Sequence, residues 1–176
     1  MRVDQRLQKV MPPGFTTAPP QGAPKYLLFR LGDARFGIDV MRVREIVAMH
    51  PLTAIPNAPP ALCGVINQRG RVVPVVDLRV RLDMSAREFD ARTCLIVVES
   101  DDDLCSALAV DAVYEVAEIT PDEIEPTPSV RGQRPPAYMR GVARIDDSVT
   151  VVLDVEELWS PAGGELRAAS EHLGDS

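Results

Sequence analysis

The stretch Gly64-Val-Ile-Asn-Gln-Arg-Gly-Arg-Val-Val-Pro-Val-Val-Asp-Leu78 contains two short apolar runs separated by a polar turn. Val65-Ile66 leads into Gln68-Arg69-Gly70, where the glycine suits a backbone with positive φ. The second run, Val72–Val76, contains a proline. Because proline cannot donate a backbone hydrogen bond, this run is predicted to be an edge strand or to contain a bulge. The whole stretch therefore predicts a β-hairpin.

The same pattern recurs later in the chain at one constant offset. Gly64-Val65 aligns without a gap with Gly141-Val142, and Asp77 aligns with Asp154. The apolar positions also coincide, Val72 with Val149 and Val75 with Val152. Aspartate is a favourable N-cap, so a short helix is predicted after each one, over 78–82 and 155–159. The chain is therefore predicted to contain two related halves, approximately 25–90 and 91–160.

Short apolar segments separated by turn signals fill the rest of residues 25–153. Residues 40–48 fit either a short helix or a twisted strand. Within them, Val43-x-Glu45-Ile46 resembles Val113-x-Glu115-Val116 of the second half. Further strands are predicted at Lys25–Leu31, Arg35–Ile38, Thr93–Glu99, Leu104–Val110, Val113–Ala117, Arg140–Ile145 and Val149–Leu153. The predicted fold class is all-β with short helices, and about five strands per half favour a small closed barrel, which removes exposed edges.

Three segments have a composition that differs from the β-rich body. Residues 1–24 are rich in proline and glycine and poor in clustered apolar residues, which predicts a disordered leader. The proline-rich run 121–136 lies between strong apolar segments, so we expect an ordered internal connection. Residues 161–176 have too few large apolar side chains for a core, which predicts a flexible C-terminal tail.

Charge and composition exclude several classes of protein. The net charge of −7 disfavours long-range attraction to nucleic acid or anionic lipid. No apolar run approaches the roughly 20 residues of a membrane span, so no membrane insertion is expected. The three cysteines, Cys63, Cys94 and Cys105, lack metal-ligand spacing and are interpreted as reduced thiols. No metal and no cofactor are predicted.

The sequence also lacks the usual signatures of an enzyme. It contains neither a glycine-rich phosphate loop nor a nucleophile elbow. Asp146-Asp147 fits a hairpin turn, and Glu156-Glu157 fits the first turn of a helix, where acidic residues favour the dipole. A small enzyme that uses paired carboxylates is thus a disfavoured alternative, and the chain is predicted not to be an enzyme.

Two arginines flank the turn at Gly70 in an otherwise acidic protein, and they permit two interpretations. The turn could be a solvated hairpin tip. Alternatively, Arg69 is a recognition residue on a rigid turn, since the planar guanidinium suits a carboxylate or backbone partner. The set Val43, Glu45 and Ile46 also permits a structural and a functional interpretation. An apolar-acid-apolar pattern usually forms one buried and one exposed face.

These motifs together resemble the CheW family of bacterial chemotaxis coupling proteins. The resemblance covers roughly residues 25–160, in order and at natural spacings. The matching segments are Gly64–Leu78, Phe36–Ile46, Ala107–Val116 and Tyr138–Val142.

The resemblance implies two intertwined five-stranded SH3-like barrels around a shared core, without catalytic activity. It further implies a cytoplasmic adaptor that is recruited to membrane receptor arrays and couples methyl-accepting chemotaxis receptors to the histidine kinase CheA. A CheW-like scaffold in a non-flagellar kinase pathway, such as surface motility or second-messenger signalling, is the alternative. The receptor-binding positions that it implies are Val43, Glu45, Ile46, Gly64, Asn67, Arg69 and Gly70; kinase-contact residues stay unassigned.

Overall fold

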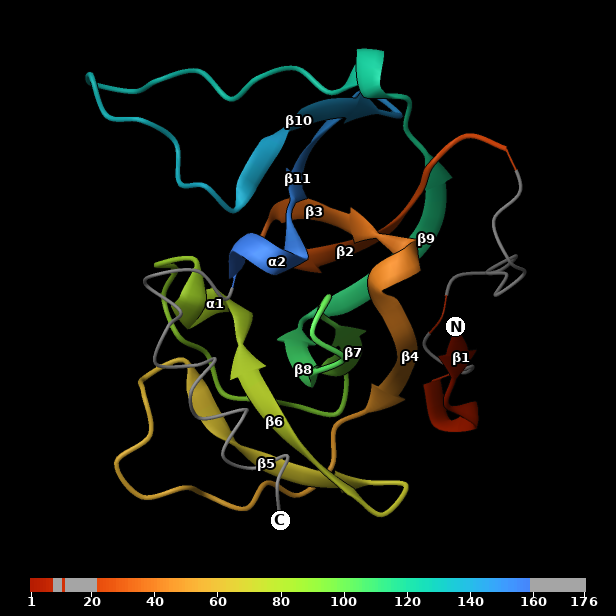
Figure 1. Ribbon diagram of the computed structural model, residues 1–176, viewed down its shortest axis with the longest axis vertical. Helices are drawn as coiled ribbons and strands as arrows, with labels where there is room; N and C mark the ends of the chain where they lie inside the picture. The colour runs from red at the N-terminus through yellow and green to blue at the C-terminus, as the bar shows by residue number, and fades with distance from the viewer. Residues whose placement is uncertain (8–10, 12–21, 159–176) are drawn as a thin grey trace.

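The computed structural model describes residues 1–7, 11 and 22–158, and two β-sheets dominate this part of the chain (Figure 1). The strands are β1 (Arg2–Val3), β2 (Lys25–Leu31), β3 (Ala34–Asp39), β4 (Val43–Ala48), β5 (Leu62–Gln68), β6 (Arg71–Asp77), β7 (Cys94–Glu99), β8 (Cys105–Val110), β9 (Ala112–Glu118), β10 (Met139–Ile145) and β11 (Ser148–Leu153). The helices are α1 (Leu78–Arg81) and α2 (Val155–Leu158), and 3₁₀ turns occupy Gln5–Leu7, Val40–Arg42 and Pro121–Glu123. The predicted all-β class with short helices is confirmed.

The two sheets exchange strands between the halves of the sequence. One sheet has the order β1-β4-β7-β8-β6-β5 and the other β10-β11-β3-β2-β9. Strands β2 and β3 from the first half therefore pair with β9–β11, whereas β7 and β8 from the second half pair with β4–β6. Two parallel pairings join strands from different halves of the sequence. Strand β6 pairs with β8, and β11 pairs with β3. Neither sheet is built from one of the segments 25–90 and 91–160 alone, which is how the halves intertwine.

The repeat seen in the sequence is a repeat of structure. The offset that maps Gly64 onto Gly141 also maps the first residues of β5, β6 and α1 onto those of β10, β11 and α2. The Asp77 carboxylate accepts a hydrogen bond from the Arg79 N–H at 3.0 Å, and that of Asp154 accepts one from the Glu156 N–H at 2.9 Å. Both predicted N-caps are thus present.

The position of β6 corrects one prediction. Val72–Val76 was expected to be an edge strand or to contain a bulge because of its proline. The edge-strand prediction is wrong, because β6 lies between β5 and β8. The register of β6 with β5 shifts between Leu62 and Gly64, near the end of the hairpin distant from its turn.

Glycine is required at the matched positions Gly64 and Gly141 because a second chain segment crosses each hairpin there. Thr53 bridges to Val65 through two backbone hydrogen bonds of 2.9 Å, and Glu125 bridges to Val142 through two of 2.8 Å. A Cβ atom on Gly64 would lie 2.7 Å from the Thr53 carbonyl oxygen, and one on Gly141 would lie 2.5 Å from the Glu125 carbonyl oxygen. The Gly-Val pairs therefore mark two equivalent backbone crossings.

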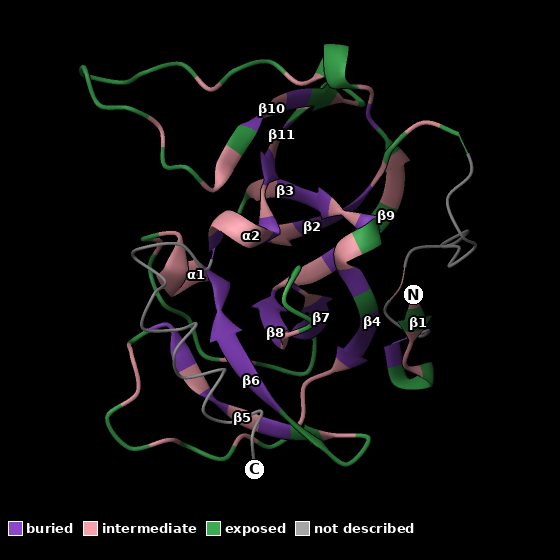
Figure 2. Ribbon diagram, viewed as in Figure 1, coloured by how far each residue is buried: buried purple, intermediate pink, exposed green. Residues whose placement is uncertain are grey.

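A shared core joins the sheets (Figure 2). Leu27 and Phe29 of one sheet pack in the same buried cluster as Ile96 and Leu108 of the other. The Phe29 ring stacks on that of Phe36 in the neighbouring strand, with centroids 5.8 Å apart. Each sheet also encloses a smaller cluster of its own. The two barrels are therefore stabilised as one unit.

The described N-terminal residues differ from the disordered leader expected for 1–24. Arg2–Val3 pairs in parallel with β4, and the Leu7 side chain is only 2% exposed in the shared core. The sequence did not reveal this anchor because a single leucine among charged residues carries no periodic signal. Positions 8–10 and 12–21 of the predicted leader, and the predicted tail 161–176, lie outside the described residues.

The proline-rich connection between β9 and β10 is partly held against the barrel. It opens with the 3₁₀ turn Pro121–Glu123, continues through the Glu125 crossing, and then extends away from the sheets (Figure 1). An isolated bridge between Val130 and Gln133 closes its far end, with Gly132 at positive φ. A short helix and a strand were the two alternatives predicted for residues 40–48. Both occur, because a 3₁₀ turn is followed by β4.

Candidate protein-binding site

The tip of the β5–β6 hairpin is a tight two-residue turn. Arg69 and Gly70 both have positive φ, 53° and 78°. The Asn67 carboxamide oxygen accepts a hydrogen bond of 3.0 Å from the Gly70 N–H. Two successive residues with positive φ match the twist of the flanking strands. The predicted positive φ of Gly70 is confirmed, and Arg69 adopts the same region without a glycine's freedom.

A buried carboxylate on the neighbouring strand holds this tip in place. Glu45 of β4 is 8% exposed. Its carboxylate accepts hydrogen bonds from Gln68 Nε2 at 2.6 Å and Arg69 Nε at 3.1 Å. The Arg69 side chain itself is 59% exposed. Because a buried acid orients an exposed guanidinium, Arg69 presents its remaining N–H groups to solvent in a restricted geometry.

The seven predicted receptor-binding residues do not form one surface. Asn67, Arg69 and Gly70 are exposed at the hairpin tip, with Glu45 beneath them. Val43 and Ile46, 6% and 0% exposed, lie in the shared core, so they support β4 from behind. Gly64 lies at the Thr53 crossing, further along β5. The structure therefore brings four of the seven together.

A shallow hollow of about 380 Å³ adjoins the tip, and we call it the Arg69 hollow. The hollow is lined by Glu45, Val47, His50, Gln68 and Arg69. The N-terminal segment 2–6 completes its lining. Neither His50 nor the segment 2–6 was assigned to the site from the sequence. Their proximity depends on the loop after β4 and on the β1–β4 pairing, which no local motif reports.

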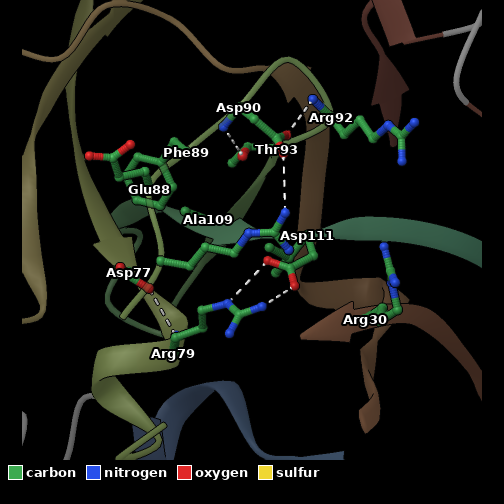
Figure 3. A pocket seen from close by; sticks show the side chains of 12 residues that line it. Arg30, Asp77, Arg79, Glu88, Phe89, Asp90, Arg92, Thr93, Ala109 and Asp111 are labelled. Atoms are coloured by element: carbon green, nitrogen blue, oxygen red, sulfur yellow. Dashed lines mark hydrogen bonds and ion pairs between the residues drawn. The ribbon is translucent and has the colours of Figure 1, made fainter. Parts of the chain in front are cut away.

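A second cavity, of about 300 Å³, lies against α1 and is lined largely by charged side chains (Figure 3). The Arg79 guanidinium forms an ion pair with Asp111, and Asp111 also accepts a hydrogen bond from the Gly32 N–H at 2.7 Å. Burial alone would raise the pKa of Asp111, but the hydrogen bonds from Arg79 and Gly32 outweigh it and lower the pKa. Arg87 pairs with Asp90 at 3.6 Å.

The Arg79–Asp111 pair connects the two sheets. Asp111 lies between β8 and β9, which belong to different sheets, while Gly32 lies in the β2–β3 turn and Arg79 in α1. Both side chains are largely buried, 11% and 16% exposed. We therefore assign this cavity a structural role at the junction of the barrels.

Other sites suggested by the sequence can be placed within the described residues. Cys63 and Cys94 are buried enough to raise the pKa of each thiol to about 11, which disfavours the reactive thiolate. Within the described ranges, no group of three or more His, Cys, Asp or Glu side chains could hold a metal ion. In the same part of the chain, no helix is long and apolar enough to cross a membrane.

Comparison with known proteins identifies the family. The family model described as "CheW-like domain" matches residues 25–162. The chain belongs to the CheW-like domain family. The predicted family resemblance and the two-barrel fold are therefore confirmed.

Curated CheW-family relatives match over most of their length. The chain is 36% identical over 145 residues to the probable chemotaxis protein CheW of Rhizobium etli, covering 82% of this chain and 93% of that protein. It is 32% identical over 136 residues to the chemotaxis protein CheW of Klebsiella aerogenes, covering 77% and 81%. Protein FrzA of Myxococcus xanthus is 30% identical over 120 residues, covering 68% and 74%.

A solved CheW-family structure has the same architecture. The scaffolding protein TtCheW from Thermoanaerobacter tengcongensis superposes with a TM-score of 0.73 at 33% identity, covering 82% of this chain and 97% of that one. The present chain thus shares the fold of that solved relative, and the hairpin with Arg69 lies within the residues that the family model matches.

Proposed function

We propose that this protein is a non-enzymatic adaptor that couples methyl-accepting chemotaxis receptors to the histidine kinase CheA, so that receptors control kinase activity. The observation that carries the proposal is the exposed Arg69 guanidinium oriented by the buried Glu45 carboxylate. Such an adaptor acts in the cytoplasm, at membrane receptor arrays. Its working parts are protein-binding surfaces, and no catalytic group is required.

The geometry of the Arg69 turn suits the cytoplasmic tip of a receptor. Arg69 uses Nε for its hydrogen bond to Glu45, and its terminal nitrogens are available to a partner in this proposal. Two parallel N–H groups can bind a carboxylate in bidentate fashion or two backbone carbonyl oxygens. A helical hairpin offers both at its turn, so we assign Asn67, Arg69 and Gly70 to direct receptor contact.

The remaining members of the predicted receptor site act indirectly in this proposal. Glu45 positions Arg69, while Val43 and Ile46 fix β4 against the shared core. Gly64 permits the Thr53 crossing that holds the base of the hairpin. Changes at these four positions should therefore alter receptor binding through the orientation of the tip.

Reversing the charge of Arg69 tests the proposal. We expect Arg69→Glu to weaken binding of a soluble receptor cytoplasmic fragment by about 10- to 100-fold, since a charged hydrogen-bonding partner is replaced by a repelling one. Titration calorimetry measures the loss, and thermal unfolding monitors the fold.

The matched control is Arg144→Glu, which makes the same charge change on the equivalent hairpin of the second half. Arg144 is exposed, and the variant should bind the fragment as the wild type does. Equal binding by Arg69→Glu and wild type would contradict the assignment of the tip. If the wild type binds neither the receptor fragment nor CheA, the proposed function is contradicted.

A second candidate function is a CheW-like scaffold in a non-flagellar kinase pathway. The similarity to FrzA of Myxococcus xanthus favours it, because that relative shares the fold family under a different name. Deleting the gene distinguishes the two: loss of swimming chemotaxis supports the first function, whereas intact swimming with a defect in surface motility or second-messenger output supports the second.

A further inference from the structure

The outer edge of β4 is occupied by the chain's own N-terminus. Arg2 and Val3 pair in parallel with Glu45 and Ile46, and the Asp4 N–H donates to the Ile46 carbonyl at 2.9 Å. The Ala48 N–H lies 3.5 Å from the Asp4 carboxylate. These contacts cover polar backbone groups that would otherwise form an exposed sheet edge beside the Arg69 hollow.

Among residues 1–7, the N-terminal segment has one buried side chain. Leu7 is 2% exposed, whereas the other residues of 1–7 are exposed or half-buried. The β1–β4 register contains only two residue pairs, while β4 pairs with β7 over five. Short edge strands with few buried contacts belong to the part of a fold that opens first.

The same segment closes one side of the Arg69 hollow. Residues 2–6 line it together with Glu45, Gln68 and Arg69. A partner that approaches Arg69 from this side must share the space with Arg2 and Arg6, which carry the same charge as Arg69. The competition is steric, since two further cations attract rather than repel a partner that offers a carboxylate.

We propose that residues 1–7 form a displaceable cover over the β4 edge and the Arg69 hollow, and that the receptor tip binds this face after the cover has moved away. This inference rests on the proposed function, because it concerns regulation of the same surface. Binding then has two steps, release of the cover and docking of the receptor. The observed affinity is reduced by the fraction of molecules in which the cover is closed.

The test compares two variants that add the same charge to the cover. Leu7→Asp places a carboxylate where the anchor packs in the core and releases the segment, whereas Gln5→Asp adds it at an exposed position and leaves the anchor. A soluble cytoplasmic fragment of a methyl-accepting receptor is the probe. We expect Leu7→Asp to bind it about tenfold more tightly than the wild type. Gln5→Asp, whose added carboxylate lies in the lining of the hollow, should bind no more tightly than the wild type.

Hydrogen exchange provides an independent measure of release. The amides of Asp4 and Ala48 should exchange faster in Leu7→Asp than in Gln5→Asp. If Leu7→Asp unfolds the core, Asp4→Pro replaces it, because proline removes the N–H that bonds to Ile46 without adding a charge to the interior. Exchange of the Ala48 amide alone then reports release, since proline has no amide hydrogen.

The outcomes separate the inference from the function on which it rests. If the amides of Leu7→Asp exchange faster but this variant binds the receptor fragment no more tightly than the wild type, the proposed cover is overturned. The proposed receptor function stands in that case. Absence of slow exchange at Asp4 and Ala48 in the wild type also overturns the cover, since it would already be open. Failure of every variant and the wild type to bind the fragment overturns the proposed function and the cover with it.

Discussion

The hairpins β5–β6 and β10–β11 share one backbone design and differ in chemistry. Both begin at a glycine-permitted crossing, both end in an aspartate-capped helical turn, and both tips contain two residues with positive φ. The tip of the first is Arg69-Gly70, and that of the second is Asp146-Asp147. The common backbone therefore supplies the fold, while the tip side chains can be exchanged without changing it.

The neighbouring strands show the same contrast. Glu45 of β4 is buried and holds Gln68 and Arg69, whereas its counterpart Glu115 on β9 is exposed. The residue equivalent to Arg69 is an aspartate, which cannot pair with a glutamate. A recognition arginine with its supporting acid is thus present in one half, which explains why we assign receptor binding to that half.

The largest expected effect comes from adding a methyl group at the two crossings. Gly64→Ala and Gly141→Ala should each lower the free energy of unfolding by about 3 kcal/mol, because the new methyl group meets a backbone carbonyl in both cases. Urea denaturation measures the loss. Gly132→Ala is the control, since its site has positive φ but open space, and about 1 kcal/mol is expected there. If all three variants lose the same amount, the crossings do not depend on glycine.

A smaller loss is expected where the halves are joined, at Asp111. Asp111→Asn leaves the largely buried Arg79 guanidinium without its counter-charge, and we expect about 2 kcal/mol less stability at neutral pH. The pKa of Asp111 is lowered in the folded state, so its charge stabilises the fold above the unfolded pKa of about 3.9 and this contribution is lost as the pH falls through the lower folded value.

The stability difference between wild type and Asp111→Asn should therefore be constant near neutral pH and shrink below about pH 4. Burial is the main cause that raises the pKa of Asp77, and the charge of Asp111 adds a smaller part. Asp77 therefore acts in the opposite direction, but its contribution largely cancels in the difference because Asp77 is present in both proteins. Chemical denaturation of both proteins over this pH range measures the trend. A difference that grows on acidification would contradict the ion-pair role.

The smallest effect tests whether the helical turns are equivalent. Asp77→Ala and Asp154→Ala should each cost about 1 kcal/mol through loss of the N-cap, measured by thermal unfolding. Asp77→Asn and Asp154→Asn retain an acceptor oxygen and should stay close to the wild type. A loss at only one of the two alanine variants would show that the repeat is not symmetric in its energetics.

Local features of the fold could be predicted from the sequence, whereas pairing between distant strands could not. The hairpins, the aspartate caps and the repeat that relates Gly64 to Gly141 follow from apolar runs and turn residues that lie close together in the chain. The exchange of β2 and β3 into the second sheet depends on contacts between segments that are far apart in the chain. Among residues 1–7, Leu7 is the one buried side chain that holds strand β1, and no local pattern marks it.

The candidate site shows the same limit. Arg69 stands out because two arginines flank a turn in an acidic chain. The burial of Glu45, which orients Arg69, depends on how β4 lies beside the hairpin, and the sequence left its exposure open. Val43 and Ile46 form core contacts. The set of receptor-binding residues implied by the family resemblance therefore includes buried residues as well as exposed ones.

Hydrogen exchange of the wild-type protein, free and saturated with a receptor cytoplasmic fragment, tests the contrast between the two hairpins most directly. We predict that receptor binding slows exchange of the backbone amides of residues 67–71 and leaves those of residues 144–148 unchanged. Protection of residues 144–148 with no change at residues 67–71 would contradict the assignment of receptor binding to the Arg69 hairpin.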